Sequence, residues 1–358
     1  MNTDNLVQNI EDIYSSSTRR KTLVIIGIIT TDVALALVSL RLGALPITVR
    51  KIASVIISKT FPFLDNNSLT LFERVAVIDI RLPRIIMAIV CGIGFAATGT
   101  AMQGVLRNPL VSSMTLGLTQ AAGFGAALAI VLDLGLIGGR YLITANSFLL
   151  CLVCLGFIYG IVRLRGASPE TVILAGIAIG FLFSAMLSFM EYIASEEQIK
   201  ELVFWLMGGI YIASWPILAF ITPVISISTV VLWRHSWNLN IMSAGEEVAR
   251  SLGINTEQVT RMCMVLSALI TATIISFTGI IGFICLVAPH IARMIIGADH
   301  RFLFPASCAV GALLLLGADT ISRTLIFPAE IPVGITTSLI GIPFFLYLII
   351  RRRRLQWQ

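Results

Sequence analysis

Ser243-Ala-Gly-Glu-Glu-Val-Ala-Arg-Ser-Leu-Gly-Ile-Asn-Thr256 is a short charged stretch between two long apolar runs, residues 215–234 and 261–278. Its acidic residues come early and its basic residue comes late, which suits the dipole of a helix, and Gly253 would end that helix. Because the flanking runs have the composition of membrane spans, we expect this polar helix to lie in water at the membrane face. The stretch is either a solvated connector or a docking surface for a soluble partner.

The composition of the whole chain is that of a membrane protein. Of its 358 residues, 57% are hydrophobic and only 12% are charged, whereas a soluble domain carries about 25% charged residues. Most of the apolar runs are long enough to cross a hydrocarbon core of about 30 Å as a helix. The runs are continuous and do not alternate, which argues against a β-barrel. The sequence therefore predicts an all-α polytopic membrane protein in contact with lipid.

About ten spans are predicted, within a transmembrane domain at 23–350. A tail at 1–22 precedes this domain and a basic tail at 351–358 follows it. The seventh and eighth spans are short and glycine-rich, so one of them could be broken or re-entrant, which requires shielding of the backbone by protein or a cavity. The predicted spans are 23–43, 84–105, 114–134, 142–163, 171–193, 215–234, 261–278, 284–297, 303–322 and 332–350.

Charge at the chain ends predicts the orientation. An even number of spans places both termini on one side, and the clusters Arg19-Arg20-Lys21 and Arg351-Arg352-Arg353-Arg354 mark that side as cytoplasmic. Residues 1–18 are polar and do not form a cleavable signal. The net charge of +6 lies mainly at the ends of apolar runs, so we read it as topology information and predict no nucleic-acid partner. We expect a multi-pass protein of the cell membrane, with a surface helix in the outer connection 44–83.

The chain has no motif for ATP chemistry. No G-x-x-x-x-G-K-[ST] is present, and none of the lysines, at 21, 51, 59 and 200, follows a glycine. Cys151-x-x-Cys154 has metal-ligand spacing but lies inside a predicted span without a second pair, so we predict packing and no metal site. Charges within the spans are few, with Asp32 and Glu191 the main acidic candidates, which disfavours an ion-driven carrier.

Arginines at the predicted outer face run against the usual charge bias. Arg81 and Arg84 open the second span in Arg81-Leu-Pro-Arg84, and Arg323 closes the ninth. These side chains either anchor the spans in lipid headgroups or meet an acidic partner that arrives from outside. In the second case the arginines would speed the partner's approach and fix its orientation more than they would raise its binding affinity.

A break separates the second and third spans at Arg107-Asn108-Pro109-Leu110. Pro109 disfavours a continuous helix, and the side chain of Asn108 can satisfy the backbone groups that the break frees. A break at the cytoplasmic end of two spans fits either a gate element or an ordinary tight turn.

Taken together, the motifs resemble the FecCD-type permeases of ABC importers for iron–siderophore, haem and cobalamin uptake. The resemblance covers residues 23–352, and the number and order of its motifs make it specific. The motifs are RLPR (81–84), TGTAMQGVLRNPL (98–110), FWLMGGI (204–210), GEEVARSLGI (245–254), TGIIGFICLVAPHIAR (278–293), DHRFLFP (299–305) and IPVGITTSLIGIPFFLYLI (331–349).

The resemblance implies a homodimer with ten helices per subunit and a translocation path at the subunit interface. Two ATPase subunits would dock below and an extracytoplasmic substrate-binding protein above, so this chain would be no enzyme and would need no cofactor, with ATP and Mg bound by the ATPase. It implies a coupling segment at 240–258 and three groups of site residues. These groups are the coupling residues Glu246, Glu247, Ala249, Arg250, Leu252 and Gly253; the docking residues Arg81, Arg84 and Arg323; and the cytoplasmic gate Asn108, Pro109, Leu110 and Thr171.

The resemblance narrows the cargo only in part. Some cobalamin permeases carry a run of small hydroxyl residues at the start of the fifth span, where this chain has Ser168-Pro169-Glu170-Thr171. We therefore expect an iron(III) chelate of the siderophore or haem type, with cobalamin or molybdate as alternatives. An ion-coupled secondary carrier and a membrane-embedded enzyme or scaffold are the alternatives from other classes.

Overall fold

The computed structural model describes residues 3–43, 47–60, 70–135, 137–326 and 328–351, and within these ranges the chain is helical and contains no strand. The helices are α1 (Thr3–Arg41), α2 (Val49–Thr60), α3 (Leu71–Val75), the π-helix η2 (Ala76–Arg81), α4 (Leu82–Val105), the 3-10 helix η3 (Ser113–Leu116), α5 (Leu118–Leu132), the 3-10 helix η4 (Gly139–Tyr141), α6 (Leu142–Arg165), α7 (Pro169–Ile193), α8 (Glu196–Leu206), α9 (Trp215–Arg234), α10 (Ser236–Ser243), α11 (Glu246–Ser251), α12 (Thr256–Thr278), α13 (Ile284–Ile296), α14 (His300–Thr324) and α15 (Val333–Arg351).

Each predicted span coincides with a helix, which confirms the predicted fold class. In the described part of the chain, 7 helical segments are long and apolar enough to cross a membrane. The third, eighth and tenth predicted spans correspond to shorter apolar helices, at Leu118–Leu132, Ile284–Ile296 and Val333–Tyr347.

Three features differ from the sequence-based expectation. α1 begins at Thr3, so the described part of the predicted tail at 1–22 is helical and continuous with the first span. The second span is extended outward, because α3 and η2 form one helical rod with α4 from Leu71 onward. α8 was not predicted, since its 11 residues carry several charges and fall well short of a span.

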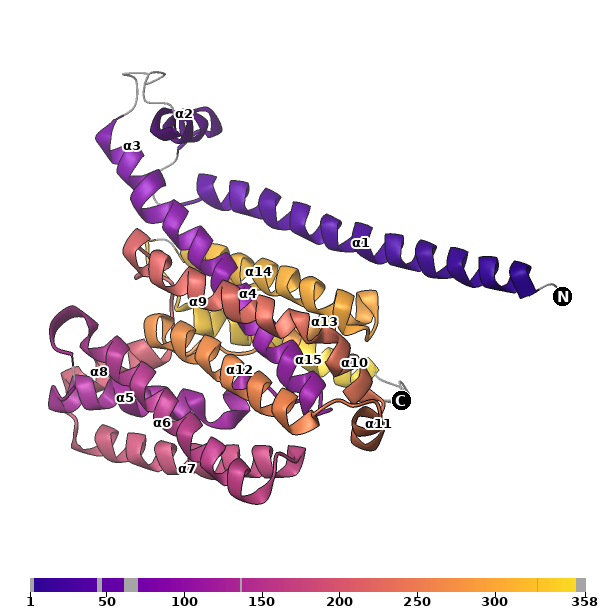
Figure 1. The fold of residues 1–358 in the computed structure, drawn as a ribbon. Helices are drawn as coiled ribbons and strands as arrows, with labels where there is room; N and C mark the ends of the chain where they lie inside the picture. The colour runs from indigo at the N-terminus through magenta and orange to yellow at the C-terminus, as the bar shows by residue number, and fades with distance from the viewer. Residues whose placement is uncertain (1–2, 44–46, 61–69, 136, 327, 352–358) are drawn as a thin grey trace.

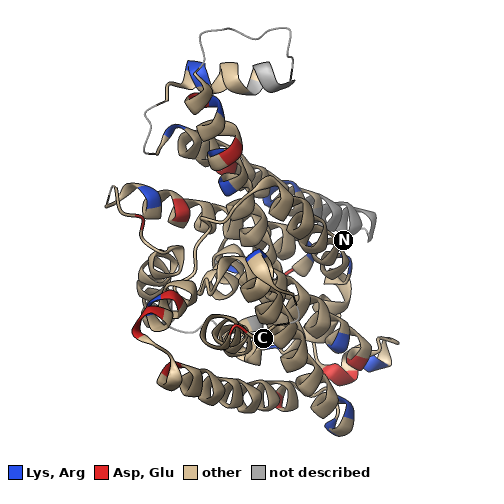
Figure 2. Ribbon diagram, turned by 90° about the vertical axis from the view of Figure 1, so that its left-hand side faces the viewer, with Lys and Arg blue, Asp and Glu red and all other residues tan. Residues whose placement is uncertain are grey.

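The helices lie roughly side by side, and the two ends of the bundle differ (Figure 1). α10 and α11 lie at the end where α1 begins and α15 finishes, whereas α2, α3 and α8 lie at the opposite end. Figure 2 looks onto this opposite end, where most of the ribbon carries no charged residue. The first and last described turns thus share the end that carries the polar segment at 243–256.

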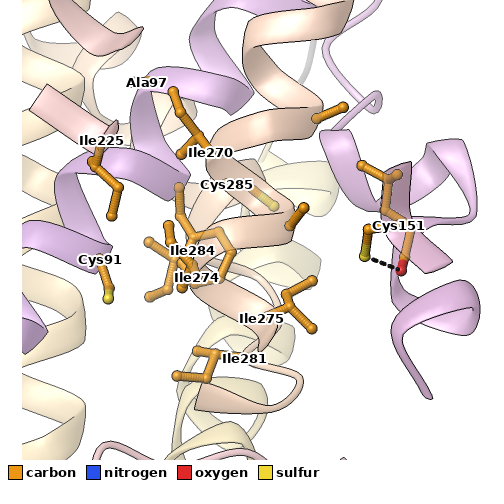
Figure 3. Packing of buried hydrophobic residues seen from close by; sticks show 14 of the residues in the cluster. Cys91, Ala97, Cys151, Ile225, Ile270, Ile274, Ile275, Ile281, Ile284 and Cys285 are labelled. Carbon is orange, nitrogen blue, oxygen red and sulfur yellow. Dashed lines mark hydrogen bonds between the residues drawn. The ribbon is translucent and has the colours of Figure 1, made fainter. Parts of the chain in front are cut away.

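α4 is the central helix, and small residues let its neighbours approach closely. A Cβ atom at Gly92 would lie 2.4 Å from the carbonyl oxygen of Gly311 in α14, and one at Gly99 would lie 1.7 Å from that of Cys285. Glycine is needed for such backbone contacts between helices. Figure 3 shows the apolar core beside this helix, with the side chains of α12 near Ala97.

The chain leaves the helical conformation between α12 and α13. α12 is unbroken over 23 residues, so the expectation of a short seventh span is wrong, whereas the eighth span is short. α13 has 13 residues, so it covers only about 20 Å at 1.5 Å per residue. The Thr278 carbonyl at the break accepts a hydrogen bond from the N–H of Gly209 at 2.7 Å. Ile281 is fully buried, so protein shields this irregular backbone.

Candidate functional site

A cavity of about 440 Å³ lies between the α4–α5 connection and α7. Its wall is apolar or weakly polar, and none of its lining residues is charged. The lining residues are Asn108, Leu110, Val111, Met114, Thr115, Gly117, Gln120, Ile173, Gly176, Ile177, Gly180, Phe181 and Ser184. Phe181 is 73% exposed in the isolated chain, so the cavity is open on the α7 side.

Asn108 holds the turn at one end of this cavity. The backbone of Arg107 is in the left-handed region with φ 47°, and Asn108 Oδ1 accepts the N–H of Leu110 at 3.0 Å. This is the local bond expected of asparagine in a turn. Asn108 and Leu110 both line the cavity, so two of the predicted gate residues face the same space.

The other two predicted gate residues have different surroundings. The cavity lining includes neither Pro109 nor Thr171 in the part of the chain that the structure describes. Thr171 belongs to the first turn of α7, where its N–H donates to the capping hydroxyl of Ser168 at 3.2 Å. Thr171 therefore contributes to the start of the helix that forms the opposite wall of the cavity.

Three glycines that were not predicted as site residues bring the walls together. A Cβ atom at Gly117 would lie 2.7 Å from the Cα of Gly180, and one at Gly176 would lie 2.8 Å from the Cα of Leu116. Gly117 also has φ +76°, a backbone conformation that favours glycine. The Gly176-x-x-x-Gly180 spacing is a sequence signal for close helix packing that could have located this contact.

The predicted coupling residues lie on and directly after α11. Glu247 is exposed and Leu252 is 64% exposed, whereas Ala249 is fully buried. Ala249 thus packs against the bundle and cannot touch a partner in this conformation. Gly253 has φ +82° and no neighbouring atom within 4 Å of a Cβ built there, so it serves as the left-handed turn after the helix.

An internal network fixes α11 against the start of α12. Arg250 Nη2 donates to Glu246 Oε1 at 2.7 Å, and Arg250 Nε donates to the hydroxyl of Thr256 at 3.3 Å. That hydroxyl in turn donates to Glu246 Oε1 at 3.2 Å. Glu246 and Arg250 therefore hold α11 to the start of α12, and Arg250, whose side chain is 60% exposed, shares the exposed surface with Glu247 and Leu252.

The predicted docking arginines are buried in one charge cluster. Arg84 Nε donates to Asp319 Oδ1 at 2.9 Å, and Arg84 Nη1 donates to Glu330 at 2.8 Å. Arg323 Nε forms an ion pair with Asp319 Oδ2 at 3.1 Å, and its Nη2 donates to the Ser39 hydroxyl. Arg81 donates to the Leu40 carbonyl at 2.8 Å. The three arginines bind α1, α4 and α14 to each other.

The exposed charges at this end include Asp79 on η2 and residues of α2 and α8. Arg50 and Lys51 are exposed on α2, and Lys51 pairs with Glu73 at 2.6 Å. Glu196 and Glu197 are exposed in the first turn of α8. For Arg81, Arg84 and Arg323, docking stays a prediction, and it requires that their guanidinium groups exchange their present partners for those of another protein.

At the opposite end, α10 contacts the corner between α13 and α14. The side-chain amide of Asn240 donates to Asp299 Oδ1 at 2.7 Å, and Arg301 Nη2 donates to Asp299 Oδ2 at 2.7 Å. Burial opposes ionisation of Asp299, but hydrogen bonds from Arg301 and Asn240 outweigh it and lower the pKa of this carboxyl to about 2. The motif 299–305 therefore begins with a helix cap whose carboxylate is stabilised by Arg301 and Asn240.

Fold and site together define a class: a polytopic α-helical transport protein with a weakly polar cavity in its bundle and a short polar helix at one end. The chain belongs to the FecCD transport family, whose model matches residues 23–351. This match confirms the resemblance found in the motifs, and it makes the chain a permease of the ABC importer type.

Several known proteins are similar to this chain over about three quarters of its length or more. An ABC transporter permease protein of Methanocaldococcus jannaschii, MJ0087, is 42% identical over 76% of this chain and 81% of that protein. The hemin transport system permease protein HmuU of Yersinia pestis is 38% identical over 77% of this chain and 83% of that protein. A solved metal-chelate-type ABC transporter in an inward-facing conformation has 30% identity and a TM-score of 0.81, covering 92% of this chain and 99% of that one.

Proposed function

We propose that this chain is the transmembrane subunit of an ATP-driven importer that moves an iron(III) chelate of the siderophore or haem type into the cytoplasm. It works as a homodimer in the cell membrane, with two ATPase subunits at the cytoplasmic end and a substrate-binding protein at the outer end. Both termini are cytoplasmic, flanking a permease domain at 23–350. The chain is no enzyme, since ATP and Mg are bound by the ATPase.

The observation that carries this proposal is the placement of α11. It is a short polar helix with exposed Glu247 and Leu252, held at the end of the bundle where both described chain ends lie (Figure 1). The chain has no P-loop of its own. A permease that needs ATP and cannot bind it must contact an ATPase in water, and α11 offers such a contact.

The open cavity supports a second copy as partner. α7 exposes large apolar side chains, including Leu174 at 66% and Phe181 at 73%. Phe181 also lines the cavity. A second copy placed against α7 would close the open side and turn two half-cavities into one path. The weakly polar wall suits a bulky chelate that passes through without being held by charge.

The proposed cargo rests on the names of similar permeases and on the chemistry of the cavity wall. Similar proteins carry the names of hemin, cobalamin, molybdate and Fe(3+)-citrate permeases, at 32–38% identity. The hemin permease is the most similar of these four. An uncharged wall suits a chelate, in which the ligand masks the charge of the metal, better than it suits a bare oxyanion. This supports an iron(III) chelate as the cargo more than molybdate.

The test is uptake by proteoliposomes that contain the permease with its ATPase and binding protein. Iron(III) siderophores, haem, cobalamin and molybdate are offered separately at equal concentration. The proposal expects uptake of an iron(III) chelate at a rate well above that of the others. Uptake of cobalamin or molybdate alone would show that the cargo is wrong and the importer architecture is right. Uptake driven by an ion gradient without the ATPase would contradict the whole proposal.

A further inference from the structure

Asn240 connects α10 to the N-terminal end of α14 by side-chain hydrogen bonds. Its Nδ2 donates to Asp299 Oδ1 at 2.7 Å. Its Oδ1 accepts the backbone N–H of His300 at 2.8 Å and lies 2.9 Å from His300 Nδ1. Both halves of one amide are therefore used on two consecutive residues of another element, which fixes the position and the rotation of α10 against it.

The group that Asn240 holds is the N-terminal cap of α14. Asp299 Oδ1 accepts the N–H of Arg301 at 3.1 Å, and the Arg301 guanidinium binds the same carboxylate. Trp233, at the end of α9, donates to the Arg301 carbonyl at 3.3 Å. Since a cap directs the first turn of its helix, moving Asn240 moves the start of α14.

His300 extends this contact to α4. Its side chain is 5% exposed, and a Cβ atom at Gly104 would lie 2.7 Å from His300 Nε2. Gly104 is in the last turn of α4, shortly before the turn at Asn108 that lines the cavity. The imidazole ring thus rests on the helix end that leads into the predicted gate.

α10 is also joined to α11 by a very short connection. Ala244 and Gly245 separate the two helices, and the N–H of Gly245 donates to the Met242 carbonyl at 3.2 Å. Gly245 has φ +126°, a conformation that favours glycine, so the chain turns sharply from one short helix into the next. A displacement of α11 therefore reaches Asn240 within two helical turns.

We infer that Asn240 is the positioning residue that carries movement of α11 to the ends of α14 and α4, and through Gly104 to the turn at Asn108. This inference rests on the proposed function, in which an ATPase moves α11. The residue touches neither ATPase nor cargo. Its part is to make three helix ends move as one body, because an amide with both its donor and its acceptor engaged transmits displacement in either direction.

The test uses the full permease with its ATPase and binding protein in proteoliposomes, with Asn240→Ala as the variant. Asn238→Ala is the matched control, since Asn238 is a partly buried asparagine of the same helix whose side chain makes no hydrogen bond within the described residues. Each chain also carries Leu110→Cys with a spin label, so that the distance between the two labels of the dimer reports the gate.

The inference expects Asn240→Ala to bind its ATPase and hydrolyse ATP normally while uptake falls by about tenfold or more, the effect of losing the partly buried hydrogen bonds of this amide. The ATP-dependent change in label distance should disappear, and Asn238→Ala should behave as the parent. Asn240→Asp should also fail, because it sets a carboxylate against Asp299. Adding Asp299→Asn should recover much of the uptake by restoring one amide–carboxylate pair.

Three results would overturn the inference: unchanged uptake in Asn240→Ala, loss of ATPase binding in Asn240→Ala alone, or no recovery in the exchanged pair. The second result would make Asn240 a support for the docking surface instead of a link to the gate. Failure of the proposed function is a different result, since the parent complex would then show no ATPase binding or no ATP-dependent uptake.

Discussion

Arg84 and Asp319 form a buried ion pair at 2.9 Å, in which the carboxylate is fully buried and also pairs with Arg323. Two cations around one carboxylate make Asp319 the residue whose loss leaves the largest uncompensated charge. Breaking a buried pair by removing one partner costs about 3–5 kcal/mol, whereas an exposed pair is worth about 0–1 kcal/mol.

We therefore predict that Asp319→Asn lowers the melting temperature of the purified permease far more than Glu330→Gln. Glu330 binds the same arginine, but its side chain is 50% exposed. Thermal unfolding in detergent, followed by the fluorescence of a thiol-reactive dye, measures both. Equal shifts in the two variants would mean that the cluster is hydrated and that its arginines are free to meet a partner.

Close packing of α7 on η3 gives the second prediction. Gly176→Ala places a Cβ atom 2.8 Å from the Cα of Leu116, so the helices must separate. We expect lower thermal stability and slower uptake. Gly156→Ala on α6 is the control, because it meets nothing within 4 Å and alanine is the better helix former by about 1 kcal/mol. A stable, active Gly176→Ala variant would show that α7 and η3 are not in tight contact.

Accessibility of the cavity wall gives the third prediction. A bulky thiol reagent attached to Phe181→Cys should block uptake, because this side chain lines the cavity. The same reagent on Ile227→Cys of α9, which is 65% exposed, should leave uptake intact. Five native cysteines are buried and Cys308 is partly buried, so background labelling should be low. Equal uptake in both labelled proteins would place the path elsewhere.

The fourth prediction concerns Asp299, whose pKa is lowered from 3.8 to about 2 in the folded protein. A lowered carboxyl pKa adds stability above the unfolded value, and this stability is lost as the pH falls from about 4 toward 2. The difference in melting temperature between parent and Asp299→Asn should stay constant from neutral pH down to about pH 5 and shrink below about pH 4. A difference that fades already near neutral pH would contradict the Arg301 and Asn240 contacts.

The exposed surface of α11 gives the fifth prediction. Glu247→Lys reverses an exposed charge outside the network of Glu246, Arg250 and Thr256. We expect reduced co-purification of the ATPase and reduced stimulated ATP hydrolysis, with an unchanged melting temperature. Glu197→Lys, an equal charge reversal on α8 at the opposite end, should retain the ATPase. If both variants retained the ATPase equally well, α11 would not be the coupling helix.

The spans could be predicted because hydrophobicity over a whole helix is a local property of the sequence. α9 coincides with its predicted range, 215–234. α8 was missed because it is amphipathic and shorter than a span, although Ser195 and Gln198 form a capping box that marks its start. Such a box is a sequence signal that hydropathy alone does not use.

The predicted site residues depended on contacts that the sequence does not contain. Arg84 and Asp319 are 235 residues apart, and Arg323 and Ser39 are 284 apart. The prediction that Arg84 and Arg323 are exposed cations rested on their positions at helix ends. It could not include the distant carboxylate that neutralises them. The turn at Asn108 was predictable in detail, because its hydrogen bond to the N–H of Leu110 is local.

The most direct test of the central claim is ATP-dependent uptake of an iron(III) chelate by the reconstituted permease, ATPase and binding protein, compared with the permease alone under an imposed ion gradient. The account predicts accumulation only with the complete complex and ATP, and loss of accumulation with Glu247→Lys. Accumulation by the permease alone under the ion gradient, unaffected by Glu247→Lys, would contradict it.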